Sequence, residues 1–345
     1  MPPPPLPPAV SLGLAIMQGH HRPTHIQMRS TMIRRQNVSS AENDEGYLDA
    51  LTQAWVRFRD SGSEWSLKVF ESDEIRRNRS SVVSEVKNAL ADCDPKPVGS
   101  YQQGLTIPGS DIDICCNFDD VKAFAPILQQ KLRAATDIRV LANSTVPVVK
   151  FRYRNISFDA TGNAYYQHHC DIAQWVSNQL QLYPGLRDAI LYVKGWAQRQ
   201  YLSSSGRGSL SSLAFIIMLV SLVENNLPIY EEGESDSSRQ TAQLLYLFFT
   251  LLEDMDFSIR LFYSKSGPQG LAAQGQELNM IQDLIARYCN PNTGYGSRLF
   301  ILDPYEYVNV GRTVDDIGII RLRRSFKVAA EIIRENKKLL CATEK

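Results

Sequence analysis

The chain has 345 residues with 37 basic and 37 acidic side chains, so its formal net charge is zero. This length allows one large or two medium domains with sizeable cores. Without a global basic field, any contact with nucleic acid must depend on local patches. The six cysteines have no C-x-x-C pair and no zinc spacing, which indicates reduced thiols. The longest apolar runs, Leu213–Val223 and Leu244–Leu252, are too short to span a bilayer, so no membrane partner is expected.

The beginning of the chain has a different composition from the rest. Met1–Ala41 contains no Asp or Glu, but it has four arginines among serines, threonines and histidines. This basic, hydroxylated and acid-poor composition is typical of a mitochondrial transit segment. We therefore expect residues 1–45 to be a disordered import signal and the protein to reside in the mitochondrial matrix. An ordinary disordered tail is the alternative, because the proline-rich start is atypical of an amphipathic presequence.

The first half of the remaining chain has a mixed helix and strand pattern. Helical spacing of apolar residues predicts helices at Tyr47–Arg59, Val69–Leu90 and Val121–Ala135. Strand-like segments occur between Val98 and Phe158. Among these, Val148–Tyr153 and Ile156–Asp159 predict a hairpin whose turn lies around Arg154–Asn155. Three arginines of the second helix could contact RNA phosphates or form a solvated helix face: Arg76, Arg77 and Arg79.

The second half has an all-helical pattern. We expect helices at Gly185–Ala197, Leu210–Leu222, Glu277–Tyr288 and Thr313–Leu340, and exposed loops at Asn225–Gln240 and Ser264–Gln276. Five basic residues near the end could carry RNA phosphates or line a solvated helix: Arg312, Arg321, Arg323, Arg324 and Lys327.

Two carboxylates and a Gly-Ser turn form the most informative motif. In Ser110–Cys116 apolar and acidic residues alternate, which predicts a strand with one polar face. Asp111 and Asp113 then project from the same face, close enough to share divalent cations. Gly99-Ser100 lies where a strand would turn into a helix, with backbone N–H groups available to phosphate oxygens. The alternative is a surface strand with two solvated acids.

A third acid strengthens the prediction of a phosphoryl-transfer site. Asp159 would end the second hairpin strand and could lie beside Asp111 and Asp113 if the strands are neighbours. Three carboxylates are what a two-metal nucleotidyl transfer requires. One cation lowers the pKa of the attacking hydroxyl, and the other neutralises the triphosphate and the leaving pyrophosphate.

Three further segments carry a family resemblance. Leu191–Arg199 (LYVKGWAQR), Gly208–Leu213 (GSLSSL) and Leu302–Arg312 (LDPYEYVNVGR) resemble the poly(A)-polymerase-associated domain of the DNA polymerase β-type nucleotidyltransferases. The resemblance covers about Lys68 to Arg334 and is greatest to terminal uridylyltransferases and non-templated poly(A) polymerases. It implies a bipartite α+β fold. A mixed-sheet catalytic domain would cover residues 46–165 and a mainly helical domain residues 166–345, with the nucleotide cleft between them; the first helix could pack on the second domain.

The resemblance also implies residue roles. Asp111, Asp113 and Asp159 match the metal-binding triad, which would hold two Mg²⁺ or Mn²⁺ ions. The phosphate-holding turn is matched by Gly99 and Ser100, and the triphosphate-binding residues by Lys194 and Ser212. Asp303 and Glu306 match the pair that orients a water at the uracil edge in members that prefer UTP. The Asp-Pro-Tyr-Glu run also has the pattern of a helix N-cap, and both roles are compatible.

This chain departs from the family pattern at several positions. Val308 stands where several uridylating members have a histidine, so that check against ATP is expected to be missing. Leu213 replaces a base-stacking tyrosine, and Gln198 replaces a second triphosphate lysine. The ribose-contacting Asn-Ser pair aligns with Cys170-Asp171. The 45 residues between Asp113 and Asp159 leave no room for an inserted middle domain, which indicates a minimal catalytic core.

We therefore expect an enzyme that adds UMP from UTP to an RNA 3′-hydroxyl without a template. It resembles the small mitochondrial terminal uridylyltransferases of kinetoplast RNA editing. The expected partners are an RNA 3′ end, UTP and a mitochondrial RNA-processing or editing complex. A non-templated poly(A) polymerase is one alternative. The other is a catalytically degenerate homologue that binds RNA or serves as a scaffold.

Overall fold

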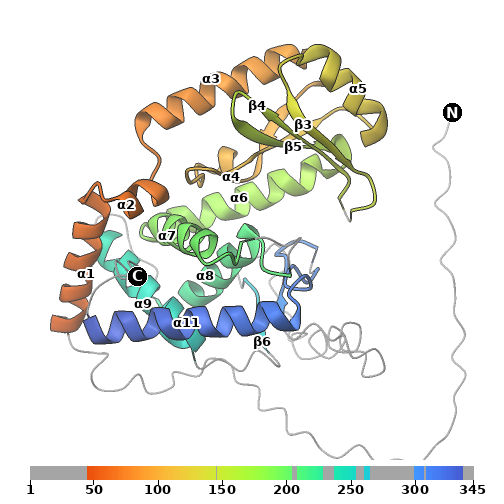
Figure 1. Cartoon of the computed structure of the whole chain (residues 1–345). Coiled ribbons are helices and arrows are strands. Elements are labelled where there is room, and N and C mark those ends of the chain that lie inside the picture. Colours follow the sequence, from red (N-terminus) through yellow and green to blue (C-terminus); the bar gives the residue numbers. More distant parts are fainter. Residues whose placement is uncertain are drawn as a thin grey trace, which may run out of the picture. The chain divides into compact units, whose positions relative to one another are not determined.

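A five-stranded mixed sheet forms one half of the described protein in this computed structural model (Figure 1). The strand order is β1-β2-β5-β4-β3, with β2 and β5 parallel and the other neighbouring pairs antiparallel. The strands are β1 Lys96–Val98, β2 Ile112–Cys116, β3 Thr136–Leu141, β4 Val148–Tyr153 and β5 Ile156–Gly162. The predicted mixed α+β fold is confirmed. We call these strands, with helices α3–α5, the sheet half.

The structure describes residues 45–144, 146–203, 208–227, 237–253, 260–264, 299–306 and 308–336. Three sequence predictions fall largely outside these residues: the transit segment, the helix at Glu277–Tyr288 and the loop at Ser264–Gln276. None of the described helices combines the length and the apolar composition that crossing a bilayer requires.

Two helices cover one face of the sheet and leave the acids on the other. These helices are α3 Asp73–Ala89 and α5 Val121–Lys131, and the short helices η1 Ala91–Cys93 and α4 Gly99–Gln102 flank β1. The apolar core under α3 and α5 contains Val82, Val83, Val86, Ile112, Ile114, Phe124, Leu128, Val149, Phe151, Phe158 and Ala160. Side chains alternate along a strand, so Asp113 and Asp159, which lie between these core residues, project from the opposite face.

The second half of the chain is a helical bundle. Its helices are α6 Tyr166–Leu182, α7 Leu186–Arg199, α8 Ser212–Asn226, α9 Ser237–Glu253 and α11 Asp316–Asn336, and η2 Asn163–Tyr165 joins β5 to α6. Aromatic rings from three helices form its centre: Trp196 of α7 lies 4.9 Å from Phe249 of α9 and 5.2 Å from Phe326 of α11. Helix α6 contacts both β1 and α7, and it passes between the sheet half and the bundle (Figure 1).

The first two helices pack against the bundle although they precede the sheet in the chain. They are α1 Glu45–Asp60 and α2 Glu64–Val69. The ring of Tyr47 lies 5.5 Å from that of Tyr246 on α9, and the fully buried Trp55 lies 5.8 Å from Tyr192 on α7. We call α1, α2, α7–α9 and α11 the helical half, and α6 the connecting helix.

Most predicted elements are present, but several need correction. The predicted helix at Val69–Leu90 is divided, because Phe70 is extended and the Ser72 hydroxyl caps α3 by accepting from the Ile75 N–H at 3.3 Å. The second half is not entirely helical, since β6 Arg260–Phe262 pairs in parallel with β7 Leu299–Ile301. The predicted hairpin turn is confirmed: Arg154 and Asn155 have φ of +46° and +64°.

The predicted loop at Asn225–Gln240 is wrong at both ends. Asn225 and Asn226 still belong to α8, and α9 begins at Ser237. The Gln240 side chain is buried, and its Oε1 accepts a hydrogen bond from the Gly185 N–H at 2.6 Å. In the sequence, a polar residue such as Gln240 is typical of an exposed loop. Only the position of its partner shows that the side chain is buried and hydrogen-bonded.

Candidate active site

Three carboxylates meet on the polar face of the sheet. The parallel register of β2 and β5 places Asp113 directly opposite Asp159. Asp111 immediately precedes β2 and lies two residues from Asp113, which places both on the same face. Asp159 is the fourth of seven residues in β5, so the prediction that it ends its strand is wrong. The strand continues because Ala160, Thr161 and Gly162 also pair with β2.

The three acids change one another's ionisation. The pKa of Asp113 is raised to about 7, mainly by burial and further by the negative charges of Asp111 and Asp159. Burial also raises the pKa of Asp159, although Lys150, opposite it on β4, donates a hydrogen bond to its Oδ2. Carboxylates this close disfavour a second and third negative charge unless a cation is present.

A glycine turn lies directly against this cluster. Gly99 follows β1, whose last residue Val98 is paired with Asp113. Gly99 has φ of +62°, and a Cβ on it would lie 2.4 Å from Asp113 Oδ2. Only glycine meets both requirements. Ser100, half-buried, follows in α4, so the predicted turn from strand to helix is present and Gly99 lies against Asp113.

Lys194 lies close to the acids but deep in the protein. Its side chain is buried, and Nζ donates a hydrogen bond to the Leu105 carbonyl at 2.5 Å. Burial lowers its pKa to about 8, against the opposing effect of Asp111 and Asp113. The ammonium group therefore joins α7 of the helical half to the loop that leads into Asp111.

A buried ion pair holds the same loop from the other side. Arg79 donates to Glu71 Oε1 at 2.6 Å and to the Ser110 carbonyl at 2.7 Å. The other oxygen of Glu71 accepts from the Thr106 hydroxyl at 2.9 Å. Arg79 and Glu71 are both buried, so both predicted alternatives for Arg79, a contact with RNA phosphates and a solvated helix face, are wrong. Its function is to position Ser110, the residue before Asp111.

Asp303 and Glu306 lie together, with a histidine between them. Asp303 is buried, and its Oδ1 accepts from the N–H groups of Tyr305 at 2.9 Å and Glu306 at 3.0 Å. These bonds cap a turn rather than a helix. His168 Nε2 lies 3.3 Å from Asp303 Oδ2, and His168 Nδ1 lies 3.5 Å from Glu306 Oε1.

The ionisation of this group is also coupled. The hydrogen bond to Asp303 is the main cause of a raised pKa for His168. Burial would raise the pKa of Asp303, but the hydrogen bonds from His168 and from two backbone N–H groups hold it below its ordinary value. His168 was missed by sequence reasoning because it lies at the start of α6, far from the Asp-Pro-Tyr-Glu segment in the chain.

The chain is similar in sequence to several known proteins. A family model described as "Domain of unknown function (DUF4269)" matches residues 82–175. Poly(A) RNA polymerase protein 2 of Saccharomyces cerevisiae is 29% identical over 196 residues, 52% of this chain and 32% of that protein. Terminal uridylyltransferase cid1 of Schizosaccharomyces pombe is 24% identical over 300 residues, 72% of this chain and 71% of that protein. An inactive non-canonical poly(A) RNA polymerase, Trf4-2 of Drosophila melanogaster, is 25% identical over 298 residues, 81% of this chain and 66% of that protein.

A solved structure of a cytoplasmic RNA terminal U-transferase superposes with a TM-score of 0.57 at 19% identity. The superposition covers 84% of this chain and 95% of the U-transferase chain. The chain is therefore similar in sequence to poly(A) RNA polymerases and to a terminal uridylyltransferase, and similar in fold to a terminal U-transferase. It spans about a third of the length of the first curated relatives that it matches.

Two further predicted site positions lie on the helical half. Ser212 is the first residue of α8 and is half-buried, while the neighbouring Ser211 is the cap, accepting from the Ala214 N–H at 3.2 Å. Gln198 is exposed on α7, and its Nε2 would lie 3.5 Å from a Cβ at Gly109. Gln198 therefore faces the loop that leads to Asp111, which is consistent with the predicted triphosphate position.

The chemistry of the acid cluster suits a divalent cation, although its carboxylates are not arranged as a complete set of metal ligands in the described residues. Within the described ranges, no group of three or more His, Cys, Asp or Glu side chains is arranged to hold a metal ion. Lys150 contacts Asp159, and Asp113 titrates near neutral pH partly because of its acidic neighbours. A cation would relieve this repulsion, and oxygen donors are the ligands that Mg²⁺ and Mn²⁺ prefer.

Proposed function

We propose that this protein is a template-independent RNA nucleotidyltransferase that adds UMP from UTP to an RNA 3′-hydroxyl. The observation that carries the proposal is the register that pairs Asp113 with Asp159, with Asp111 and the Gly99 turn beside them. A surface strand with solvated acids would not require three carboxylates and a glycine turn to lie together. The similarity to poly(A) RNA polymerases and to a terminal uridylyltransferase supports nucleotidyl transfer to RNA.

In this proposal each residue has a defined role. Asp111, Asp113 and Asp159 would hold two Mg²⁺ or Mn²⁺ ions, which activate the hydroxyl and neutralise the triphosphate when bound. The 3′ oxygen attacks the α-phosphorus, the bond to the β-phosphate oxygen breaks, and pyrophosphate leaves. Asp159 accepts the hydroxyl proton, since burial makes its carboxylate more basic than an exposed one. The backbone of Gly99 and Ser100 and the side chain of Ser212 bind the phosphates.

Lys194 is buried, so in this proposal its ammonium acts on the phosphates through its positive charge and not as a solvent-exposed ligand. Its ammonium holds the loop before Asp111 and lowers the pKa of Asp113. Arg79 supports the same loop from the opposite side.

The preference for UTP rests on the group formed by Asp303, Glu306 and His168. Two carboxylates suit a donor on the base such as uracil N3–H, directly or through water. His168 holds both carboxylates by its two ring nitrogens and so orients them. Val308 stands where several uridylating members have a histidine. In this chain His168 of α6 supplies a histidine next to Asp303 and Glu306 instead.

The decisive experiment extends a short single-stranded RNA with each of the four NTPs separately. Extension with UTP alone or in strong preference supports the proposal, and extension mainly with ATP would identify a poly(A) polymerase instead. The Asp111→Ala/Asp113→Ala variant is expected to lose extension by at least about 10³-fold while keeping its circular dichroism spectrum. Retained extension in that variant would overturn the two-metal assignment.

A catalytically degenerate RNA-binding homologue is the second candidate. Leu213 and Gln198 replace residues that grip the nucleotide in the family, and one relative is described as inactive. This candidate predicts no extension with any NTP in the wild type. We favour the enzyme because all three carboxylates are present.

We also propose that the protein acts in the mitochondrial matrix within an RNA-processing or editing complex. The acid-free composition of Met1–Ala41 supports import. Fluorescence microscopy of the full chain and of a chain lacking residues 1–41, each fused to a fluorescent protein, tests this. Mitochondrial signal that persists without these residues would contradict it.

A further inference from the structure

An exposed tyrosine ends helix α7 in a conformation that favours glycine. The Leu202 N–H donates to the Ala197 carbonyl at 2.8 Å, and the Tyr201 N–H donates to the Gln198 carbonyl at 3.1 Å. This pair of bonds is the Schellman arrangement, in which the residue at the Tyr201 position is usually glycine. Tyr201 has φ of +56°, and its side chain is 78% exposed. The fold gains no buried contact from this ring and bears the strain of a left-handed side-chain residue.

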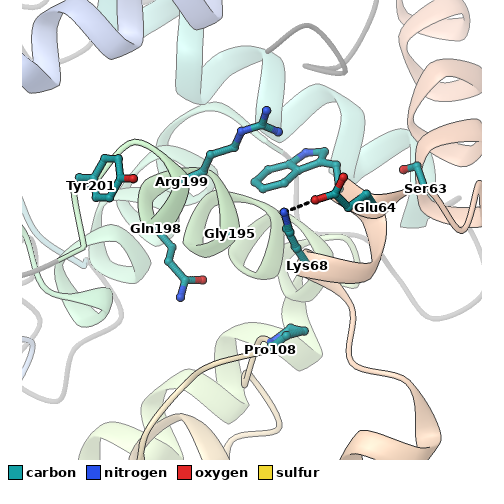
Figure 2. A pocket seen from close by; sticks show the side chains of 9 residues that line it. Ser63, Glu64, Lys68, Pro108, Gly195, Gln198, Arg199 and Tyr201 are labelled. Atoms are coloured by element: carbon teal, nitrogen blue, oxygen red, sulfur yellow. Dashed lines mark hydrogen bonds and ion pairs between the residues drawn. The ribbon is translucent and has the colours of Figure 1, made fainter. Parts of the chain in front are cut away.

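The ring borders a cavity with basic and aromatic walls. The cavity has a volume of about 600 Å³. Arg199 lies with its guanidinium 5.0 Å from the centroid of the Trp65 ring, and Lys68 forms an exposed ion pair with Glu64. Figure 2 shows Gln198 and Arg199 extending from α7 in different directions, with Tyr201 at the end of the helix and Lys68 across the cavity.

The cavity shares a loop and a helix with the acid cluster, although none of the three acids lines it. Pro108, on its wall, lies three residues before Asp111. Gly195, also on the wall, follows Lys194 directly. The loop and the helix that form the cavity are therefore the two elements that Lys194 joins beside the acids.

We propose that this surface, Lys68, Arg199 and Tyr201, binds a single-stranded segment of the RNA substrate. The proposal rests on RNA being the substrate of the proposed function. One base stacks on the exposed Tyr201 ring, and the adjacent phosphates contact the ammonium of Lys68 and the guanidinium of Arg199. Aromatic stacking with neighbouring basic groups is the general means of binding single strands without sequence readout. A free triphosphate would use the charges alone, with no role for the ring.

The first test changes stability and RNA binding in opposite directions. Tyr201→Gly removes the stacking ring and relieves the left-handed strain. In the full chain it is expected to weaken binding of a fluorescein-labelled single-stranded RNA of about 15 nucleotides by about tenfold, measured by anisotropy without NTP. The same variant is expected to raise Tm by about 2 °C. Tyr201→Phe keeps the ring and should bind RNA as the wild type does.

A matched pair of lysines tests the charge contribution. Lys68 is 60% exposed and paired with Glu64 four residues away, and Lys327 is 67% exposed and paired with Glu331 four residues away. Lys68→Gln should reduce RNA affinity and lower the slope of log affinity against log salt by about one ion. Lys327→Gln should change neither. The reverse result would place the RNA on α11 and overturn the proposal.

The outcomes separate this proposal from the proposed function. Unchanged RNA affinity in Tyr201→Gly overturns the RNA surface even if the wild type extends RNA with UTP. Reduced affinity in Tyr201→Gly, with Tyr201→Phe unaffected, supports the surface even if no NTP is incorporated. If Tyr201→Gly raises the KM for UTP but not the Kd for RNA, the surface serves the nucleotide and the proposal is wrong.

Discussion

Asp113 shows how the residue environment sets the chemistry of the candidate site. A carboxyl on an isolated strand would titrate near about 4, but burial and two acidic neighbours raise its pKa to about 7. The charged form therefore costs stability whenever no cation is present. The same cost makes the site ready to bind one, because a divalent ion removes the repulsion.

We predict that Asp113→Asn stabilises the protein in the absence of metal. A raised carboxyl pKa contributes stability at low pH that is lost as pH rises from about 4 through about 7. In urea unfolding with EDTA, the variant should exceed the wild type by about 1–3 kcal/mol at pH 8 and by much less at pH 5. Added Mg²⁺ should stabilise the wild type at pH 8 and leave the variant unchanged. Equal stability of both proteins in EDTA at pH 8 would contradict this.

His168 and the adjacent His169 have pKa values shifted in opposite directions. Asp303 and Glu306 face its two nitrogens, Asp171 adds a further negative charge, and these groups raise its pKa. Burial and the charge of His168 lower the pKa of the adjacent His169. Two consecutive histidines are thus distinguished only by which side of α6 each one occupies.

We predict that His168→Gln removes stability that the wild type has only at low pH. A histidine pKa raised by folding gives stability that is fully present below about 6.5 and is lost as pH rises through the folded value. The wild type should exceed the variant by about 1 kcal/mol at pH 6, with the difference shrinking toward pH 9. His169→Gln is the matched control: its lowered pKa predicts a difference from wild type that changes with pH in the opposite direction. Parallel pH profiles for the two variants would show that the contacts of His168 are unimportant.

At the scale of elements, the turn from β1 into α4 carries the strictest geometric requirement. Gly99 needs a left-handed φ and a close approach to Asp113. Gly62 has a similar φ of +59°, but a Cβ added to it would have no other atom within 4 Å. Comparing substitutions at Gly62 and Gly99 therefore separates the strain caused by φ from the strain caused by contact with Asp113.

We predict that Gly99→Ala lowers RNA extension by more than about 100-fold, because the new methyl group displaces Asp113. Its unfolding free energy should fall by about 1–3 kcal/mol. Gly62→Ala should cost about 1 kcal/mol from backbone strain and keep wild-type extension. Comparable loss of extension in both variants would mean that the contact with Asp113 has no functional role.

At the scale of the molecule, α1 links the start of the described chain to the helical half. Leu51, Trp55 and Phe58 are buried, and Trp55 packs on α7, the helix that carries Lys194. A segment that precedes the sheet in sequence therefore supports the helix that holds the loop before Asp111. The predicted division at residue 165 allowed the first helix to pack on the second domain, and α1 does pack on α7 and α9.

We predict that Trp55→Ala destabilises the protein by about 3–5 kcal/mol through the cavity it leaves. Urea unfolding followed by circular dichroism measures this, and hydrogen exchange should show lost protection in α7 and α9. Leu67→Ala, at a side chain that is 54% exposed, should change stability by less than about 0.5 kcal/mol. Unchanged protection in α7 would show that α1 is only a peripheral element.

Elements with local signals could be predicted from the sequence. Alternation in Ser110–Cys116, the hairpin at Val148–Asp159 and the helical spacing of α7 and α8 each follow from side-chain period, which depends only on neighbouring residues. The Gly99 turn was also predictable, since its residue types fit few other conformations. These signals were enough to place Asp111 and Asp113 on one face.

Contacts between residues far apart in the chain could not be predicted in this way, because they depend on the fold. The register of β2 with β5 placed Asp159 beside Asp113, and the path of α6 brought His168 to Asp303 and Glu306. Arg79 has the sequence pattern of an exposed helix residue, and only the fold shows that Glu71 and Ser110 are its partners. Charged residues have the same local pattern whether they face solvent or a buried partner, and the free energy that separates the two cases comes from contacts that chain neighbours do not make.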